Sequence, residues 1–267
     1  MTKKEKLILL LKYPFRIINY GLQNFKEELF QKTVAAKYGI ERLPTVDLLE
    51  LFPDLQEDLK IYSFLEGTSL ITDIILLKAL ARTFQKCSFL EIGSWRGESI
   101  SNIAEVAEKC TSITLSEKEM KDMGFDKSFV DAHGFFSKNL KNIKVIKHNS
   151  QTYDFSVLNE KFDLIFIDGD HTFEGVFSDT KNVFNLRKNK ESIIVWHDYG
   201  YTTERVRPSV LAAILKGIPK EKHKNLYHVS NTICAIYIED KVFNTYITKY
   251  PSYPNKLFTI DLRAKKI

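Results

Sequence analysis

The stretch FDLIFIDGDH, residues 162–171, decides the fold class of this chain. A run of apolar residues, most of them β-branched or aromatic, ends abruptly in two carboxylates and an imidazole. Such a run is typical of a strand that is buried on both faces, as in a parallel sheet. Open α/β sheets bind ligands at the carboxyl ends of their strands. Asp168, Asp170 and His171 are therefore candidate site residues.

A second stretch of the same kind begins about thirty residues later. Residues 192–199, SIIVWHDY, again pass from an apolar run into an imidazole and a carboxylate. The spacing corresponds to about one strand-helix-strand unit. We therefore expect two neighbouring parallel strands to bring His197 and Asp198 to the same edge of the sheet as Asp168. This edge is the predicted reaction site.

Composition indicates an ordinary soluble globular chain. Of its 267 residues, 44% are apolar and 27% are charged, which suits one large domain with extensions. The net charge of +5 is modest, and no Lys/Arg block is interleaved with aromatic residues. Nucleic acid is therefore not an expected partner. The basic balance favours an anionic substrate or an anionic membrane surface.

The cysteines and the apolar runs bear on the compartment. Cys87, Cys110 and Cys234 are odd in number and lack metal-like spacing, which predicts reduced, packed thiols and a cytoplasmic location. No apolar stretch approaches the roughly 20 residues of a membrane-spanning helix. The run at residues 7–11 stops at Lys12, and no cleavage site typical of a secretory signal follows.

Residues 1–60 form a predicted helical N-terminal extension. Apolar residues at near-helical spacing indicate two or three short helices, broken at Pro14, Pro44 and Pro53. The extension is expected to pack on the main domain or on another subunit of a homo-oligomer. Alternatively, residues 3–26 form a basic amphipathic helix that makes peripheral contact with a membrane.

Residues 61–242 form the predicted main domain, and residues 243–267 a C-terminal tail. After a helix at 69–84, strands and helices alternate, which predicts a doubly wound α/β sheet. The expected strands are 88–92, 112–115, 143–148, 162–167 and 192–196. The expected helices are 99–109, a polar segment up to 139, a short one near 156, 173–186 and 208–216. Residues 225–230 and 232–239 form a terminal hairpin, and 257–262 one more short strand in the tail.

A glycine turn follows the first strand. Residues 91–99, EIGSWRGES, place Gly93 and Gly97 between a strand and a helix, where the backbone can approach a ligand closely. The pattern is not G-x-G-x-x-G, and the carboxylate of Glu91 would repel a pyrophosphate. It suits a ligand with an ammonium or sulfonium group, although Arg96 partly offsets its charge. A plain tight turn with a solvated Glu91 is the alternative.

Two further positions are candidates for holding a nucleoside. Glu117, twenty-four residues after Gly93, follows the second strand, where an acid commonly binds a ribose diol. After the third strand, His148, Asn149 and Ser150 are placed to reach an adenine edge. The alternatives are an exposed glutamate at a helix start and a pair of helix-capping residues.

These motifs together resemble class I S-adenosylmethionine-dependent methyltransferases. Residues 91–97, 166–176 and 197–199 are similar to the bacterial branch with the I-D-G-D-H motif, to which sugar and macrocin-type O-methyltransferases belong. The resemblance covers residues 65–240. It departs from the family at 187–191, RKNKE, where relatives carry Pro-Gly-Gly. It implies a Rossmann-like seven-stranded sheet whose last strand inserts antiparallel, in agreement with the terminal hairpin.

The resemblance also implies a cofactor and a set of site residues. The implied cofactor is S-adenosylmethionine, bound by Glu91, Gly93, Ser94, Trp95, Gly97, Glu117, Ser150 and Asp168. Some relatives place a metal on acids at these two strand ends, and carboxylates suit Mg²⁺, so the predicted metal ligands are Asp168, Asp170 and Asp198. Alternatively, Asp168 only borders the cofactor and Asp170 caps the following helix.

The predicted function is O-methylation of a small polar acceptor, such as a sugar or glycan precursor. Methyl transfer to a hydroxyl needs close alignment and removal of a proton. His171 or His197 is the predicted base, with Asp168 beside it as a further catalytic residue. Two other functions remain open. A nicotinamide-dependent oxidoreductase is disfavoured by Glu91 and the missing G-x-G-x-x-G, and a non-catalytic nucleotide-binding module by the polar strand ends.

Overall fold

The computed structural model describes residues 14–267, with side chains from residue 21 onward. Five parallel strands form one side of its main sheet, up to the edge strand β4: β2 (Ser88–Ile92), β3 (Lys109–Thr114), β4 (Ile143–Lys147), β5 (Leu164–Ile167) and β6 (Ile193–Trp196). Their order across the sheet is β6-β5-β2-β3-β4. This order reverses at β2, which is the switch point where doubly wound sheets open a crevice for a ligand.

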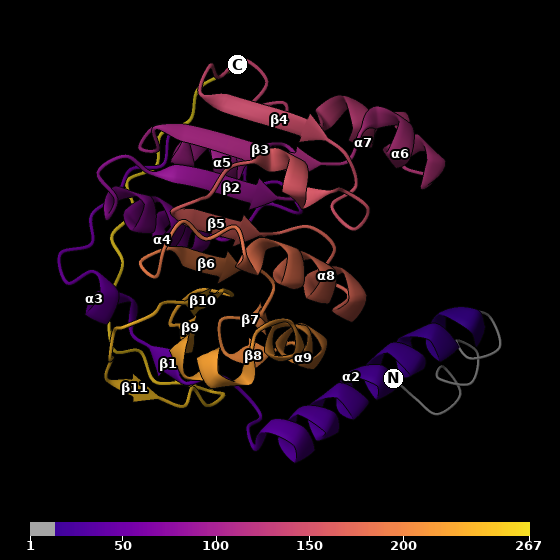
Figure 1. The fold of residues 1–267 in the computed structure, drawn as a ribbon, viewed down its shortest axis with the longest axis vertical. Helices are drawn as coiled ribbons and strands as arrows, with labels where there is room; N and C mark the ends of the chain where they lie inside the picture. The colour runs from indigo at the N-terminus through magenta and orange to yellow at the C-terminus, as the bar shows by residue number, and fades with distance from the viewer. Residues whose placement is uncertain (1–13) are drawn as a thin grey trace.

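A terminal hairpin completes seven strands. β10 (Ala235–Tyr237) runs antiparallel to both of its neighbours, β6 and β9 (Leu226–Val229). The predicted fold class is therefore confirmed: a Rossmann-like, doubly wound sheet with an antiparallel last strand, shown in Figure 1. Beyond β6, the chain forms a separate small hairpin of β7 (Gly200–Thr202) and β8 (Arg205–Val206).

Two short strands lengthen the sheet to nine. β1 (Thr45–Val46) pairs in parallel with β9, and β11 (Thr245–Tyr246) pairs antiparallel with β1. Both come from segments that we expected outside the main domain. The domain boundaries at residues 60 and 242 stay a prediction, although hydrogen bonds of the sheet cross both of them.

Helices cover both faces of the sheet. α4 (Ile71–Arg82) and α5 (Glu98–Ile103) pack on the face that carries Phe89, whereas α8 (Phe173–Phe184) and α9 (Pro208–Gly217) pack on the face that carries Leu90. Successive strand residues point to opposite faces, so burial of both faces demands continuous apolar runs. This is why the strand run before Asp168 has no polar alternation.

The N-terminal segment differs from the prediction. Instead of two or three short helices broken at prolines, α2 (Pro14–Tyr38) is one helix of 25 residues, and α3 (Leu48–Leu51) is a single turn. Pro14 begins α2, because the first turn of a helix tolerates a residue without an N–H group. α2 packs against α9 and extends away from the sheet at one end of the molecule (Figure 1). The predicted membrane-contacting helix, residues 3–26, lies partly outside the described residues and stays a prediction.

Smaller differences concern segment lengths. The first helix after β2 ends at Ile103, and β3 begins at Lys109, where we expected helix. The polar segment forms α6 (Glu117–Asp122) and α7 (Lys127–Ala132), and two 3-10 helices are η1 (Phe155–Leu158) and η2 (Lys220–Asn225). The expected strand at 257–262 is wrong. Its apolar side chains, Leu257 among them at 95% exposure, have no face to pack on.

Among the helices of the described part of the chain, none has the length and apolar character needed to cross a membrane.

Candidate active site

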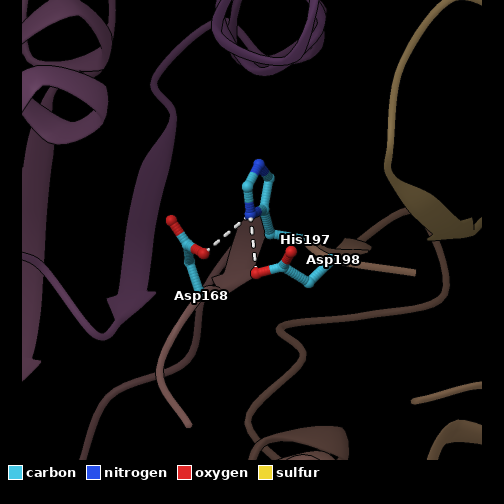
Figure 2. Close-up of side chains that lie close together, drawn as sticks. All are labelled: Asp168, His197 and Asp198. Carbon is cyan, nitrogen blue, oxygen red and sulfur yellow. Dashed lines mark hydrogen bonds and ion pairs between the residues drawn. The ribbon is translucent and has the colours of Figure 1, made fainter. Parts of the chain in front are cut away.

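Three predicted site residues meet at the carboxyl edge of the sheet. Nδ1 of His197 lies 2.9 Å from Oδ1 of Asp168 and 3.3 Å from Oδ2 of Asp198, as Figure 2 shows. We call Asp168, His197 and Asp198 the acid–histidine cluster. Ile167 of β5 pairs with Trp196 of β6, so the residues that follow them emerge side by side. The structure thus brings the carboxyl ends of β5 and β6 together, as the spacing of the two apolar runs in the sequence predicted.

The backbone of Asp198 is part of this geometry. Its φ is +55°, in the left-handed region. A non-glycine residue there carries about 1 kcal/mol of strain, which the surrounding contacts must outweigh. Such residues gather at functional sites. The guanidinium of Arg207 holds this carboxylate from the other side, with Nη2 3.2 Å from Oδ1 of Asp198.

Asp73 of α4 belongs to the site, and the sequence analysis missed it. The side chain is completely buried, and its Oδ2 lies 3.1 Å from Nε2 of His197. Backbone N–H groups of Leu70 and Ile233 donate to the same carboxylate at 2.9 and 3.0 Å. The available signal was a carboxylate within an otherwise apolar helix segment, which is costly to bury without partners.

Electrostatics make His197 an unsuitable base. Burial alone would lower the pKa of His197, but Asp168, Asp198 and Asp73 outweigh it and raise that pKa well above the usual value. Burial raises the pKa of Asp168 and His197 opposes this rise. The imidazole is therefore held protonated, with both nitrogens donating. A cation bound in place of the Nδ1 proton would engage the same nitrogen, so in neither state can His197 accept a proton from a substrate.

The cluster fits a divalent metal ion. Asp168, His197 and Asp198 each offer one ligand atom, and these atoms lie within 4.8 Å of one another. The two carboxylates suit Mg²⁺ or Mn²⁺, and the imidazole favours a transition-metal ion over Mg²⁺. A metal-ligating histidine usually gives its other ring nitrogen to a carboxylate, and Asp73 stands in that position.

Asp170 is not brought into this group. Its carboxylate accepts hydrogen bonds from the backbone N–H of Thr172 at 2.9 Å, the Thr172 hydroxyl at 2.8 Å and the side-chain amide of Gln151 at 3.1 Å. It therefore organises the turn that enters α8, in line with the alternative considered for it. Among the described residues, the group that could hold a metal ion contains His197 and lacks Asp170.

A cavity of about 340 Å³ opens at the carboxyl ends of β2 to β5. We call it the donor cavity, after the methyl donor that the sequence analysis predicts as cofactor. Residues that the sequence analysis assigned to cofactor binding line it, namely Gly93, Ser94, Trp95, Ser150 and Asp168. The other three assigned residues, Glu91, Gly97 and Glu117, do not.

Glu91, Gly97 and Glu117 lie elsewhere in the structure, outside the lining of the donor cavity. Glu91 is fully buried below the glycine turn, where the hydroxyl of Ser99 donates to both carboxylate oxygens at 3.0 Å. Burial, reinforced by the charge of Asp168, raises the pKa of Glu91 to about 8. Gly97 precedes α5 at a φ of +83°. Glu117 is exposed at the start of α6, and the end of β3 presents Thr114 to the cavity instead.

Gly93 is required by the close approach of two strand ends. Its φ is +83°, and a Cβ atom built on it would lie 2.3 Å from the backbone oxygen of Asp168. A side chain there would force the end of β2 away from the end of β5. Gly93 therefore keeps the floor of the donor cavity next to the acid–histidine cluster.

Trp95 forms a wall of the donor cavity. Its ring stacks on Phe129 of α7, with the centroids 4.9 Å apart, and the guanidinium of Arg96 lies 3.7 Å from its centroid. Gly67 packs against the same indole so closely that a Cβ atom would lie 2.3 Å from it. Contacts from three segments thus fix the orientation of this ring.

A second, larger cavity was not foreseen from the sequence. It measures about 690 Å³ and lies between α2, the start of α8 and α9. We call it the α2 cavity. His171, an exposed residue in the loop after β5, lines both this cavity and the donor cavity. Of the two candidate bases, His171 is the one that faces both spaces.

Comparison with known proteins finds one family model that matches part of the chain. Residues 90–199 match a family model for a methyltransferase domain. This segment contains the glycine turn, the donor cavity wall at Trp95 and the whole acid–histidine cluster.

Relatives are distant. An uncharacterized protein of Acanthamoeba polyphaga mimivirus is 30% identical over 153 residues, which are 53% of this chain and 64% of that protein, so the match spans less than two thirds of the relative. A putative caffeoyl-CoA O-methyltransferase from Staphylococcus aureus is 16% identical over 85% of this chain and 99% of that one, with a TM-score of 0.44. CalS11, a TDP-rhamnose 3'-O-methyltransferase of calicheamicin biosynthesis, is 15% identical over 64% and 80%, with a TM-score of 0.46. Identity this low says nothing about the substrate of this chain.

Proposed function

We propose that this protein is an S-adenosylmethionine-dependent methyltransferase that methylates a hydroxyl group of a small polar acceptor, such as a sugar or glycan precursor. One observation carries the proposal. The donor cavity, inside the segment that matches a methyltransferase domain, is lined by the glycine turn and by Asp168 of the acid–histidine cluster. Donor and reacting groups would thus meet at one edge of the sheet.

Donor binding depends on the glycine turn in this proposal. Gly93 lets the backbone approach the ligand, and Trp95 lines the cavity beside it. Glu91 below the turn has a raised pKa because it is buried. A cationic donor nearby favours the charged form of a carboxyl group, so binding would draw the pKa of Glu91 downward.

The transfer itself is an in-line displacement. The acceptor oxygen attacks the methyl carbon, the carbon–sulfur bond breaks, and S-adenosylhomocysteine leaves. The hydroxyl proton must go to a base, and we assign this role to His171, since it borders both cavities and both nitrogens of His197 are engaged.

The acid–histidine cluster supports this step. When bound by Asp168, His197 and Asp198, a divalent cation would supply Lewis acidity that lowers the pKa of an acceptor hydroxyl. Asp73 fixes the orientation of the His197 ring, and Arg207 restrains Asp198. These contacts hold the cluster in one arrangement before any ligand enters.

Calorimetric titration of the full-length protein with S-adenosylmethionine and S-adenosylhomocysteine tests the proposal. We expect both to bind at one site per chain. A parallel fluorescence titration with NADH should show no saturable binding, which separates a methyltransferase from an oxidoreductase on a similar sheet. Folded protein that binds neither sulfur nucleoside would contradict the assignment.

A further inference from the structure

The α2 cavity is built by contacts that tie α2 to two other helices. Phe30 of α2 stacks on Phe173 of α8, with the centroids 4.9 Å apart and the planes at 23°. Glu27 accepts hydrogen bonds from the backbone N–H and the hydroxyl of Ser209 in α9, at 3.0 and 2.7 Å. The space between the three helices is therefore a defined cavity with aromatic walls.

Positive charge predominates in this cavity. Among the described residues, its lining contains four cationic side chains, Lys26, Lys37, Arg207 and Lys216, and two carboxylates, Glu27 and Glu174. Glu27 is already occupied by Ser209. The ammonium of Lys216 lies over the rings of Phe173 and Phe177, at 5.1 and 4.4 Å from their centroids. An aromatic face does not accept the charge-assisted hydrogen bonds that an anion accepts. The Lys216 ammonium can therefore still pair with an anion.

Arg207 connects this cavity to the acid–histidine cluster. One of its terminal nitrogens holds Asp198 at 3.2 Å, while its guanidinium carbon lies 4.7 Å from the centroid of the Tyr201 ring. Its Nε atom is buried and has no hydrogen-bond partner among the described residues. A buried donor without a partner costs free energy. The guanidinium that carries it also lines the α2 cavity.

We propose that the α2 cavity binds the methyl acceptor and that this acceptor is a ring compound with a phosphate or carboxylate group. The inference rests on the proposed methyl-transfer function, because it names the substrate class of that site. The anion pairs with Lys216 and Lys37, and the ring packs on the aromatic walls. The acceptor hydroxyl then reaches His171, which forms part of the wall of both cavities.

Phenyl phosphate, benzoate and benzyl alcohol are the probes that test this proposal, because they share a ring and differ in charge. Calorimetric titration of the full-length protein should show saturable binding of at least one anion and none of the neutral alcohol. The better-bound anion identifies whether the acceptor group is a phosphate or a carboxylate. Lys216→Ala should weaken that binding about tenfold, the loss expected for one charge-assisted contact.

Lys220→Ala is the matched control, since Lys220 is an exposed lysine of η2 outside the cavity. It should leave anion binding unchanged. S-adenosylhomocysteine is titrated into every variant to monitor the donor cavity separately. If the nucleoside binds but neither anion does, or if Lys216→Ala binds the anion as the wild type does, the acceptor assignment fails while the methyltransferase proposal stands. Absence of nucleoside binding instead overturns the proposed function and, with it, this inference.

Discussion

The Nε2 atom of His197 lies 3.1 Å from Oδ2 of Asp73, although 124 residues separate the two in the chain. Asp73 comes from α4, which precedes the first strand of the predicted methyltransferase segment. Its carboxylate is completely buried and is also held by two backbone N–H groups. The orientation of the histidine at the end of β6 therefore depends on a helix outside the segment 90–199 that matches the family model.

Replacing this carboxylate should change the protonation of His197. In metal-free protein, Asp73→Asn removes one of the negative partners that raise the pKa of His197, so that pKa should fall toward its usual value. The free energy of unfolding should fall by about 1–3 kcal/mol, because a buried charged acceptor is lost. NMR titration of the histidine ring nitrogens measures the first effect and chemical denaturation the second.

Asp163→Asn is the matched control for this variant. Asp163 is also buried, and it accepts hydrogen bonds from the N–H and the hydroxyl of Ser88 at 2.9 and 2.7 Å, but at the amino end of β5. It should lose a similar amount of stability and leave the titration of His197 as in the wild type. Equal effects of both substitutions on His197 would show that Asp73 has only a structural role.

Gly93→Ala should abolish binding of S-adenosylhomocysteine and destabilise the fold. The new methyl group would lie 2.3 Å from the backbone oxygen of Asp168, so the ends of β2 and β5 must separate. Gly39→Ala is the control, because Gly39 has a comparable φ of +71° and no atom lies within 4 Å of the position that its new methyl group would take. It should cost only about 1 kcal/mol, the strain of the left-handed conformation. Nucleoside binding by Gly93→Ala at wild-type affinity would contradict the close-approach argument.

Metal binding distinguishes the ligand set seen in the structure from the one expected from the sequence. We predict that Mn²⁺, followed by electron paramagnetic resonance, binds the wild-type protein. Asp198→Asn and His197→Gln should weaken binding by at least about tenfold. Asp170→Asn should retain it, because that carboxylate is occupied by Thr172 and Gln151.

The opposite pattern would restore Asp170 as a ligand in place of His197. Turnover that is equal in Mg²⁺ and in chelator would remove the metal from the mechanism and leave the cluster as a protonated histidine between carboxylates.

Asp179 should make stability depend on pH. It is completely buried in α8. Burial raises its pKa from 3.8 to about 7, although a hydrogen bond from the side chain of Ser150 opposes this rise. Between these values the folded protein keeps a proton that the unfolded chain releases. The free energy of unfolding therefore falls as pH rises through this window, by up to about 1.4 kcal/mol per pH unit.

Asp179→Asn removes the titratable carboxyl group. The free energy of unfolding of this variant should therefore not show the fall with rising pH that Asp179 causes. Urea denaturation at several pH values between 4 and 7 should show the variant gaining stability relative to the wild type as pH rises. Parallel curves for the two proteins would mean that Asp179 is already ionised in the folded state.

Sequence reasoning succeeded where burial dictates the pattern. The apolar runs before Asp168 and His197 are typical of strands covered on both faces, and their spacing predicted a parallel pairing. It failed where the structure depends on contacts distant in sequence. β1 has only two residues and shows no periodicity, and Pro14 can begin a helix as well as break one.

The candidate site, like the fold, was only partly predictable from the sequence. Asp168, His197 and Asp198 are adjacent because β5 and β6 are in register. Asp73 could not be assigned, since nothing in its own segment points to a histidine 124 residues away. Glu117 was chosen by counting residues, whereas the strand end determines that Thr114 faces the donor cavity.

β1 has a consequence for the order in which the chain can fold during synthesis. Its neighbours in the sheet, β9 and β11, begin at Leu226 and Thr245, so the ribosome makes them last. The leading segment therefore emerges long before the strands that secure it. A nascent chain halted before residue 226 would leave β1 without either neighbour, although α9, against which α2 packs, would already have been made.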